Sequence, residues 1–152
     1  MIEKGSRAPD FTLASDEGGD VTLSSLRGKR VVLYFYPKDD TPGCTIQACD
    51  FRDATPAFGE LDAVVLGVSA DSLESHGKFR KKFGLNFPLL ADEDHSVCEA
   101  YGVWKEKSMY GRKFMGIERS TFLIDEEGTV AEVWRNVKAK GHAEMLAEVL
   151  GG

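Results

Sequence analysis

The sequence predicts an α/β fold in which a mixed central β-sheet is flanked by helices. Residues 31–36 and 63–69 are continuous runs rich in β-branched and other apolar side chains, which is typical of strands buried on both faces of a sheet. A helical stretch separates them, and strands that alternate with helices indicate a sheet covered by helices. Two further strands flank the turn-forming residues 125–128, which indicates an antiparallel hairpin. The length of 152 residues fits one domain, residues 1–152.

The N-terminal part is predicted to form a β-hairpin. Residues 11–13 and 21–23 alternate between apolar and polar side chains, and residues 16–20 between them favour a turn. A turn or short helical piece is expected at residues 24–29, before the buried strand of residues 31–36.

The middle of the chain is predicted to alternate helices and strands. A helix should begin at Pro42 and end or kink near Thr55-Pro56, because proline lacks the N–H that a helix interior needs. The elements that follow are a strand at residues 63–69, a helix at 72–83 closed by Gly84, a short strand at 87–90 and a short helix at 94–101.

The last third is predicted to contain a hairpin and a closing helix. The two strands of the hairpin are expected at residues 117–124 and 129–135, and residues 142–150 have the pattern of an amphipathic helix. We found no internal repeat, low-complexity tract or linker in the sequence.

Composition excludes several classes of function. The net charge of −6 argues against nucleic-acid binding, which needs a basic surface. Residues 1–5 lack the apolar segment of a signal peptide, and no apolar run approaches membrane-spanning length. Three cysteines do not form a disulfide framework, so the reducing cytoplasm is the expected location. The sequence does not fix the oligomeric state, and a monomer is the working expectation.

Cys44 is the strongest candidate for a reactive residue. It follows Thr41, Pro42 and Gly43, directly after a predicted strand. Thr41 is a good helix N-cap and Pro42 suits the first helical position, so Cys44 should lie in the first turn. Free N–H groups and the helix dipole favour a negative charge there, and the thiolate is the nucleophilic form of cysteine.

A helix terminus alone does not provide enough stabilisation for a largely ionised thiol. An ordinary thiol is only a few per cent ionised at neutral pH, and making it about 90% thiolate needs roughly 3.4 kcal/mol. A helix terminus supplies about 0.3–2 kcal/mol. The sequence should therefore bring an arginine or lysine to Cys44.

Cys49 lies five residues after Cys44. On one regular helix the two Cα atoms would be about 8.6 Å apart, beyond the roughly 7 Å that a disulfide tolerates. This distance argues against a structural disulfide, and two interpretations of Cys49 follow. Cys49 is either a buried small side chain or the partner in a transient redox disulfide that forms when the helix opens. The third cysteine, Cys98, is interpreted as a packing residue.

The cysteines and histidines do not have the spacing of a metal site. A ferredoxin-type cluster needs a further Cys-x2-Cys, and the three histidines show no zinc-finger spacing. We therefore expect no metal and no cofactor.

The segment from Tyr36 to Cys49 closely resembles the active-site segment of peroxiredoxins, in particular the bacterioferritin comigratory protein, or peroxiredoxin Q, subfamily. The order of elements, with a cysteine at a helix start after the first central strand, is similar to a thioredoxin-like fold. The likeness covers nearly the whole chain and is carried by residues 36–49, 50–53, 66–69, 90–95, 101–104 and 117–125.

The resemblance assigns a role to each matching residue. Cys44 matches the peroxidatic cysteine, which attacks the peroxide and becomes a sulfenic acid, and Cys49 matches the resolving cysteine of one branch of the subfamily. Thr41 matches the threonine that contacts the sulfur and the peroxide, and Arg119 matches the arginine that supports the thiolate. The substrate-binding set is then Thr41, Pro42, Gly43, Cys44 and Arg119.

Gln47 departs mildly from this pattern, because many members of the subfamily carry Glu at its position. The neutral amide keeps an acceptor but removes a charge. The hydrogen-bond network around the cysteine is therefore expected to differ from that of relatives with Glu at this position.

The resemblance implies an atypical two-cysteine peroxidase that reduces hydrogen peroxide and organic hydroperoxides. The implied disulfide joins Cys44 to Cys49, and thioredoxin or a similar dithiol reductant would reduce it. Two alternatives use the same cysteine pair: a thiol–disulfide oxidoreductase acting on proteins, and a redox sensor.

Overall fold

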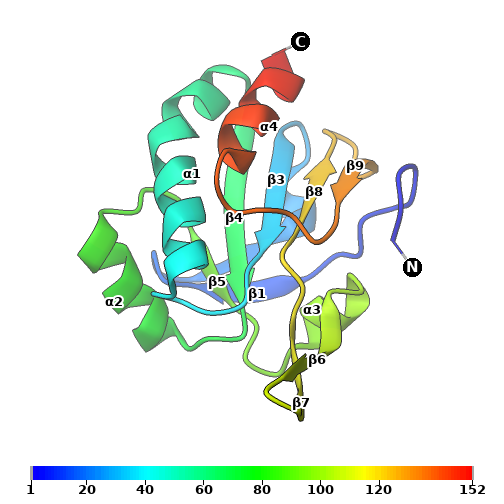
Figure 1. Cartoon of the computed structure of the whole chain (residues 1–152). Coiled ribbons are helices and arrows are strands. Elements are labelled where there is room, and N and C mark those ends of the chain that lie inside the picture. The colour runs from blue at the N-terminus through cyan, green and yellow to red at the C-terminus, as the bar shows by residue number, and fades with distance from the viewer. Residues whose placement is uncertain (1, 152) are drawn as a thin grey trace.

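The computed structural model describes residues 2–151 (Figure 1). Seven strands form one sheet in the order β2-β1-β5-β4-β3-β8-β9, and β6 and β7 form a separate two-stranded sheet. The elements are β1 (Thr12–Ser15), β2 (Asp20–Thr22), the 3-10 helix η1 (Leu23–Leu26), β3 (Arg30–Phe35), α1 (Pro42–Glu60), β4 (Ala63–Ser69), α2 (Leu73–Phe83), β5 (Leu89–Ala91), α3 (Ser96–Ala100), β6 (Trp104–Met109), β7 (Arg112–Ile117), β8 (Ser120–Ile124), β9 (Val130–Trp134) and α4 (His142–Gly151).

The predicted mixed sheet and N-terminal hairpin are both present. The central strand β3 pairs in parallel with β4 and antiparallel with β8, and β4 pairs in parallel with β5. The strands β1 and β2 form the antiparallel hairpin, and β8 and β9 form the second predicted hairpin. Within residues 2–151, no helix combines the length and the apolar character needed to cross a bilayer.

The sheet separates two hydrophobic clusters, because successive side chains of a strand point to opposite faces. Leu33 and Phe35 of β3 pack on one face, with α3 and the N-terminal segment. Val32 and Tyr34 of the same strand pack on the other, beneath α1, α2 and α4 (Figure 1). Cys44 belongs to this second cluster. Cys44 of α1 therefore packs on the face of the sheet to which Val32 and Tyr34 point.

The helix α1 does not end near Thr55-Pro56 as predicted, but continues through Pro56 to Glu60. A proline inside a helix leaves the carbonyl four residues earlier without its N–H donor. Here that carbonyl belongs to Arg52, and the side-chain amide of Asn86 donates to it at 3.2 Å. A donor from outside the helix replaces the missing bond, so this continuation depends on tertiary structure.

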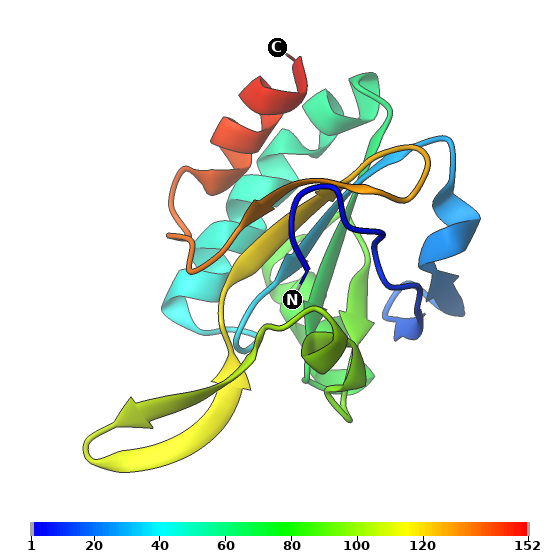
Figure 2. The same cartoon turned by 90° about the vertical axis from the view of Figure 1, so that its right-hand side faces the viewer.

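The predicted strand over residues 117–124 is in fact two strands that belong to different sheets. Ile117 ends β7, and Ser120 begins β8, so Glu118 and Arg119 lie in the break between them. The hairpin of β6 and β7 was not predicted, and it extends away from the body of the molecule (Figure 2). Its strands are largely exposed, so they lack the strict apolar–polar alternation that marks a half-buried strand.

The smaller elements agree with the sequence within a few residues. Ser72 caps α2 by accepting the N–H of Ser75, and Gly84 closes it with φ of 62°, a left-handed conformation suited to glycine. The predicted strand of residues 87–90 is displaced toward the C-terminus, to β5. The predicted helix of residues 94–101 is shorter, and residues 24–29 contain only the end of η1.

Candidate active site

Cys44 lies in the first turn of α1, as predicted, and only 2% of its surface is exposed. The N–H of Thr45 donates to the carbonyl of Thr41 at 2.8 Å, which is the first bond of the helix. The N–H groups of Gly43 and Cys44 precede that bond and have no carbonyl within the helix to accept them. Two backbone donors without helical acceptors and the positive end of the helix dipole therefore lie in the turn that carries Cys44.

Thr41 occupies the N-cap position, with extended backbone angles, but its side chain does not cap the helix. Its hydroxyl instead donates to the carbonyl of Lys38 at 2.7 Å. Thr41 is thus at the predicted N-cap position, but its side chain does not form the capping hydrogen bond, and its hydroxyl is directed back into the loop before α1. The oxygen of Thr41 retains lone pairs that can accept a hydrogen bond from a bound molecule.

Arg119 supplies the cation that the sequence required near Cys44. It lies in the break between β7 and β8, and its Nη2 is 3.4 Å from the sulfur of Cys44. Its Nη1 donates to Oε1 of Gln47 at 2.6 Å, which fixes the plane of the guanidinium. A Cβ atom on Gly43 would lie 3.0 Å from Nη2, so glycine at position 43 leaves the space that Arg119 occupies.

Gln47 is fully buried behind the guanidinium. Because Oε1 accepts from Arg119, its Nε2 points the other way, and this nitrogen has no hydrogen-bond partner within residues 2–151. The buried hydroxyl of Tyr34 likewise has no hydrogen-bond partner within residues 2–151. The neutral amide of Gln47 holds Arg119 in place without adding a negative charge near the sulfur of Cys44.

Lys107 is a second cation of this region that the sequence analysis did not single out. It comes from β6, and its ammonium group donates to the carbonyl of Ile117, two residues before Arg119. Burial lowers the pKa of Lys107, and the positive charge of Arg119 lowers it further. The pairing of β6 with β7 brings Lys107 to the site. Because this hairpin was not predicted, the sequence analysis offered no reason to place Lys107 near Cys44.

Cys49 is on α1 with Cys44, as the sequence predicted, and both are free thiols. Five residues along a regular helix give the Cα separation of about 8.6 Å calculated above, which is too long for a disulfide. Cys49 is half-buried, whereas Cys44 is buried. The two sulfurs can meet only if the start of α1 unwinds.

Cys98 lies on the opposite face of the sheet from Cys44. It is fully buried in the cluster that contains Leu33, and its N–H donates to Asp92 at 2.7 Å. Burial, together with the Asp92 carboxylate, raises the pKa of the Cys98 thiol far above its ordinary value. This cysteine is therefore kept as a neutral thiol and cannot reach Cys44 across the sheet.

Replacing Cys98 with alanine is expected to leave intact the peroxide turnover and the Cys44–Cys49 disulfide that the resemblance implies, and to lower the melting temperature by removing buried volume. The disulfide is checked by mass spectrometry of the oxidised variant. Loss of the disulfide in this variant would assign the resolving role to Cys98 in place of Cys49.

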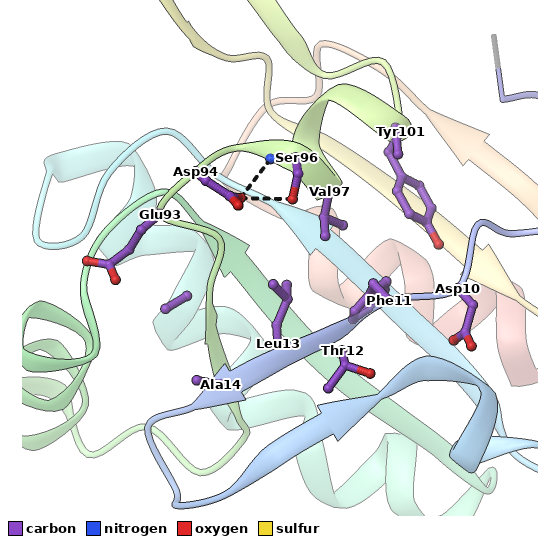
Figure 3. Close-up of a pocket in the computed structure, with 12 residues that line it drawn as sticks. Asp10, Phe11, Thr12, Leu13, Ala14, Glu93, Asp94, Ser96, Val97 and Tyr101 are labelled. Carbon is purple, nitrogen blue, oxygen red and sulfur yellow. Dashed lines mark hydrogen bonds between the residues drawn. The ribbon is translucent and has the colours of Figure 1, made fainter.

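A hollow of about 580 Å³ lies elsewhere, between β1 and α3 (Figure 3). Its lining includes Leu13, Asp94 and Tyr101, and none of the predicted site residues. Asp94 there accepts hydrogen bonds from the backbone and the hydroxyl of Ser96, as the dashed lines show. The candidate reaction thus belongs to the start of α1 and not to this hollow.

One group of side chains among residues 2–151 has the proximity of metal ligands. Atoms of Asp39, Asp71 and His76 all lie within 4.8 Å of one another. They are engaged in hydrogen bonds instead, since Nδ1 of His76 is 2.6 Å from Asp39 and Nε2 is 3.0 Å from the carbonyl of Leu90. With both ring nitrogens occupied, the imidazole has no free lone pair to offer.

Comparison with known proteins supports the resemblance predicted from the sequence. The model of the AhpC/TSA family matches residues 4–133. Peroxiredoxin Bcp of Bacillus subtilis is 56% identical over 149 residues, which cover 98% of this chain and 95% of the relative. A putative peroxiredoxin bcp of Coxiella burnetii is 54% identical over 150 residues, which cover 99% and 97%.

Solved structures agree with the fold. The bacterioferritin comigratory protein of Xanthomonas campestris, described with its alkyl peroxide reduction activity, matches with a TM-score of 0.88 and 46% identity, over 93% of this chain and 90% of that one. A cysteine-to-serine variant of PrxQ from Xylella fastidiosa matches with a TM-score of 0.94 and 41% identity, over 99% and 96%. These matches confirm the predicted thioredoxin-like fold.

Proposed function

Because the chain belongs to the AhpC/TSA family and its relatives are peroxiredoxins, we propose that it is a thiol-dependent peroxidase that reduces hydrogen peroxide and organic hydroperoxides. The observation that carries the proposal is the contact of 3.4 Å between Arg119 and the sulfur of Cys44 at the start of α1. It joins a nucleophile, a cation and free backbone donors in one place, which is what attack on a peroxide requires.

In the first step, the thiolate of Cys44 attacks one oxygen of the hydroperoxide, and the O–O bond breaks. The sulfur is oxidised to a sulfenic acid, and the other oxygen leaves as an alkoxide or hydroxide, which takes a proton to become an alcohol or water. Arg119 and the N–H groups at the helix start stabilise the charge that develops on the oxygens. The oxygen of Thr41 accepts the O–H of the peroxide, since its own proton is already donated to Lys38.

In the second step, the thiolate of Cys49 attacks the sulfenic sulfur of Cys44 and releases hydroxide, which leaves as water after it takes a proton. The Cys44–Cys49 disulfide is then reduced by an external dithiol protein, for which thioredoxin is the proposed reductant. A reducing compartment such as the cytoplasm suits this cycle, because all three cysteines are free.

The test is peroxide consumption by the purified chain with thioredoxin, thioredoxin reductase and NADPH. Continuous turnover that needs every component supports the proposal. Fast exchange with protein disulfides but slow peroxide consumption would identify a thiol–disulfide oxidoreductase, and a single oxidation without turnover would identify a sensor.

Oxidation is expected to melt the start of α1. Cys44 and Cys49 are too far apart on the intact helix, and opening at a helix end costs little because its first N–H groups lack partners within the helix. Hydrogen exchange over residues 41–54 should accelerate when the dithiol becomes the disulfide. Exchange in β4, a central strand of the sheet, serves as the control and should not change. Equal protection of residues 41–54 in both states would show that the helix need not open.

A further inference from the structure

A buried hydrogen-bond network holds the loop that leads into the candidate site. Asp39 lies in this loop, two residues before Thr41, and it is buried. Its carboxylate accepts the hydroxyl of Tyr36 at 2.6 Å and that of Ser75 at 2.8 Å. Its N–H donates to Asp71 at 2.8 Å, so both its backbone and its side chain are held.

The remaining partner of Asp39 is His76 of α2, which is fully buried. Nδ1 of His76 is 2.6 Å from the Asp39 carboxylate, and Nε2 is 3.0 Å from the carbonyl of Leu90 in β5. Both partners are acceptors. A neutral imidazole carries a single N–H and satisfies one of them, whereas the imidazolium carries two and satisfies both. Protonated His76 beside an ionised Asp39 therefore satisfies both contacts.

The charges that surround His76 support this state. Burial alone would lower the pKa of His76, but the hydrogen bond and negative charge of Asp39 outweigh it, so the pKa is raised above the ordinary 6.5. Asp71 faces the ring from the β4–α2 connection and adds a second negative charge. Directly after β3, the hydroxyl of Tyr36 lies 3.4 Å from Nδ1, and burial raises the pKa of Tyr36, which keeps this group neutral.

The loop between Asp39 and Thr41 transmits this interaction to the site. Asp40 has a φ of 56°, in the left-handed region that is strained for a residue other than glycine. Its ion pair with Lys82 is exposed, so it contributes little to holding that conformation. The buried hydrogen bonds of Asp39, including the one to His76, thus attach the strained loop that places Thr41 and begins α1.

We propose that protonated His76 is a positioning residue of the peroxide site: it holds Asp39, and through the loop it holds Thr41 and the first turn of α1 in the reactive arrangement. Loss of its proton releases the loop and slows the reaction of Cys44. This inference rests on the proposed peroxidase function. It predicts that the reaction of Cys44 with peroxide slows at alkaline pH.

The direction of the pH effect follows from linkage. A histidine whose pKa is raised by folding contributes its full stability below the unfolded value near 6.5, and this contribution is lost as the pH rises through the folded value. The rate at which peroxide oxidises Cys44 should therefore fall at alkaline pH. The midpoint of this fall should equal the midpoint of the His76 titration.

The experiment measures this rate in single turnover from acid to alkaline pH. In His76→Gln the rate should be roughly 10- to 100-fold lower at neutral pH and should lack the alkaline fall. In Asp39→Asn the fall should move to lower pH, because the imidazolium has lost its charged partner. His95→Gln is the matched control, since His95 is partly exposed and its ring contacts Glu99 and Trp104, and it should keep the wild-type profile.

A second measurement needs neither peroxide nor a variant of the network. In Cys44→Ser protein, where the reactive thiol does not titrate, NMR follows the His76 ring and the Thr41 amide together. The signals of the His76 ring and the Thr41 amide should change with pH at the same midpoint. Different midpoints, or an alkaline fall that persists in His76→Gln, would overturn the positioning role. A shared NMR midpoint in a chain that does not reduce peroxide would leave the positioning intact and reject the proposed function.

Discussion

Replacing Cys44 with serine is expected to reduce peroxide turnover to less than a few per cent of the wild-type rate. The substitution keeps the size of the side chain and its place in the first turn of α1, but an alcohol does not ionise at neutral pH. The backbone donors and Arg119 remain and have no nucleophile to assist. The measurement is peroxide consumption with the thioredoxin system, and turnover well above this level would reject Cys44 as the attacking residue.

Cys49→Ser distinguishes the second cysteine from the first. This variant should still reduce one equivalent of peroxide per chain, because Cys44 and Arg119 are unchanged, but it should not form the intramolecular disulfide. Mass spectrometry should find a sulfenic acid, or its overoxidised products, at Cys44. A variant that continues to turn over with thioredoxin would show that Cys49 does not resolve the intermediate.

Arg119→Ala is expected to slow the oxidation of Cys44 by roughly 10²–10³-fold, which is the usual cost of removing a donor that stabilises developing charge. The variant loses the contact of 3.4 Å to the sulfur and leaves the amide oxygen of Gln47 buried without its donor. The measurement is the single-turnover rate at which peroxide oxidises Cys44. The helix terminus then provides the remaining stabilisation by itself.

Two variants test whether the geometry of Arg119 matters as well as its charge. Arg119→Lys keeps a positive charge but loses the planar fork that reaches both Cys44 and Gln47, so an intermediate rate is expected. Arg112→Ala removes an exposed arginine from the β6–β7 hairpin and should react as the wild type does. An unchanged rate in Arg119→Ala would assign the supporting charge to another group, with Lys107 the next to test.

Local patterns made the central part of the fold predictable. The apolar run that became β3 and the proline that begins α1 are both signals within a few residues, and they placed Cys44 in the first helical turn. The need for a cation at Cys44 came from comparing the energy of ionisation with the effect of a helix terminus. The choice of Arg119 came from the family pattern, since it lies 75 residues from Cys44 in the sequence.

The features that sequence reasoning missed depend on contacts between distant segments. Pro56 stays inside α1 because Asn86 donates to the carbonyl that the proline leaves free. Thr41 turns its hydroxyl to Lys38 because of the shape of a loop, which no helix-capping rule describes. His76 looked like one of three scattered histidines, and only the folded chain brings it to Asp39.

The β6–β7 hairpin offers a place to attach a reporter. Its two-residue turn places Tyr110 at φ of 53° and Gly111 at φ of 77°, and Tyr110 is 97% exposed. Exposed loop tips accept inserted sequence, and the seven-stranded sheet does not include this hairpin. A fluorophore inserted between these two residues would lie at the tip of the hairpin, whose second strand, β7, ends two residues before Arg119. Its emission should then change when α1 opens, which would turn the chain into an optical sensor of its own oxidation.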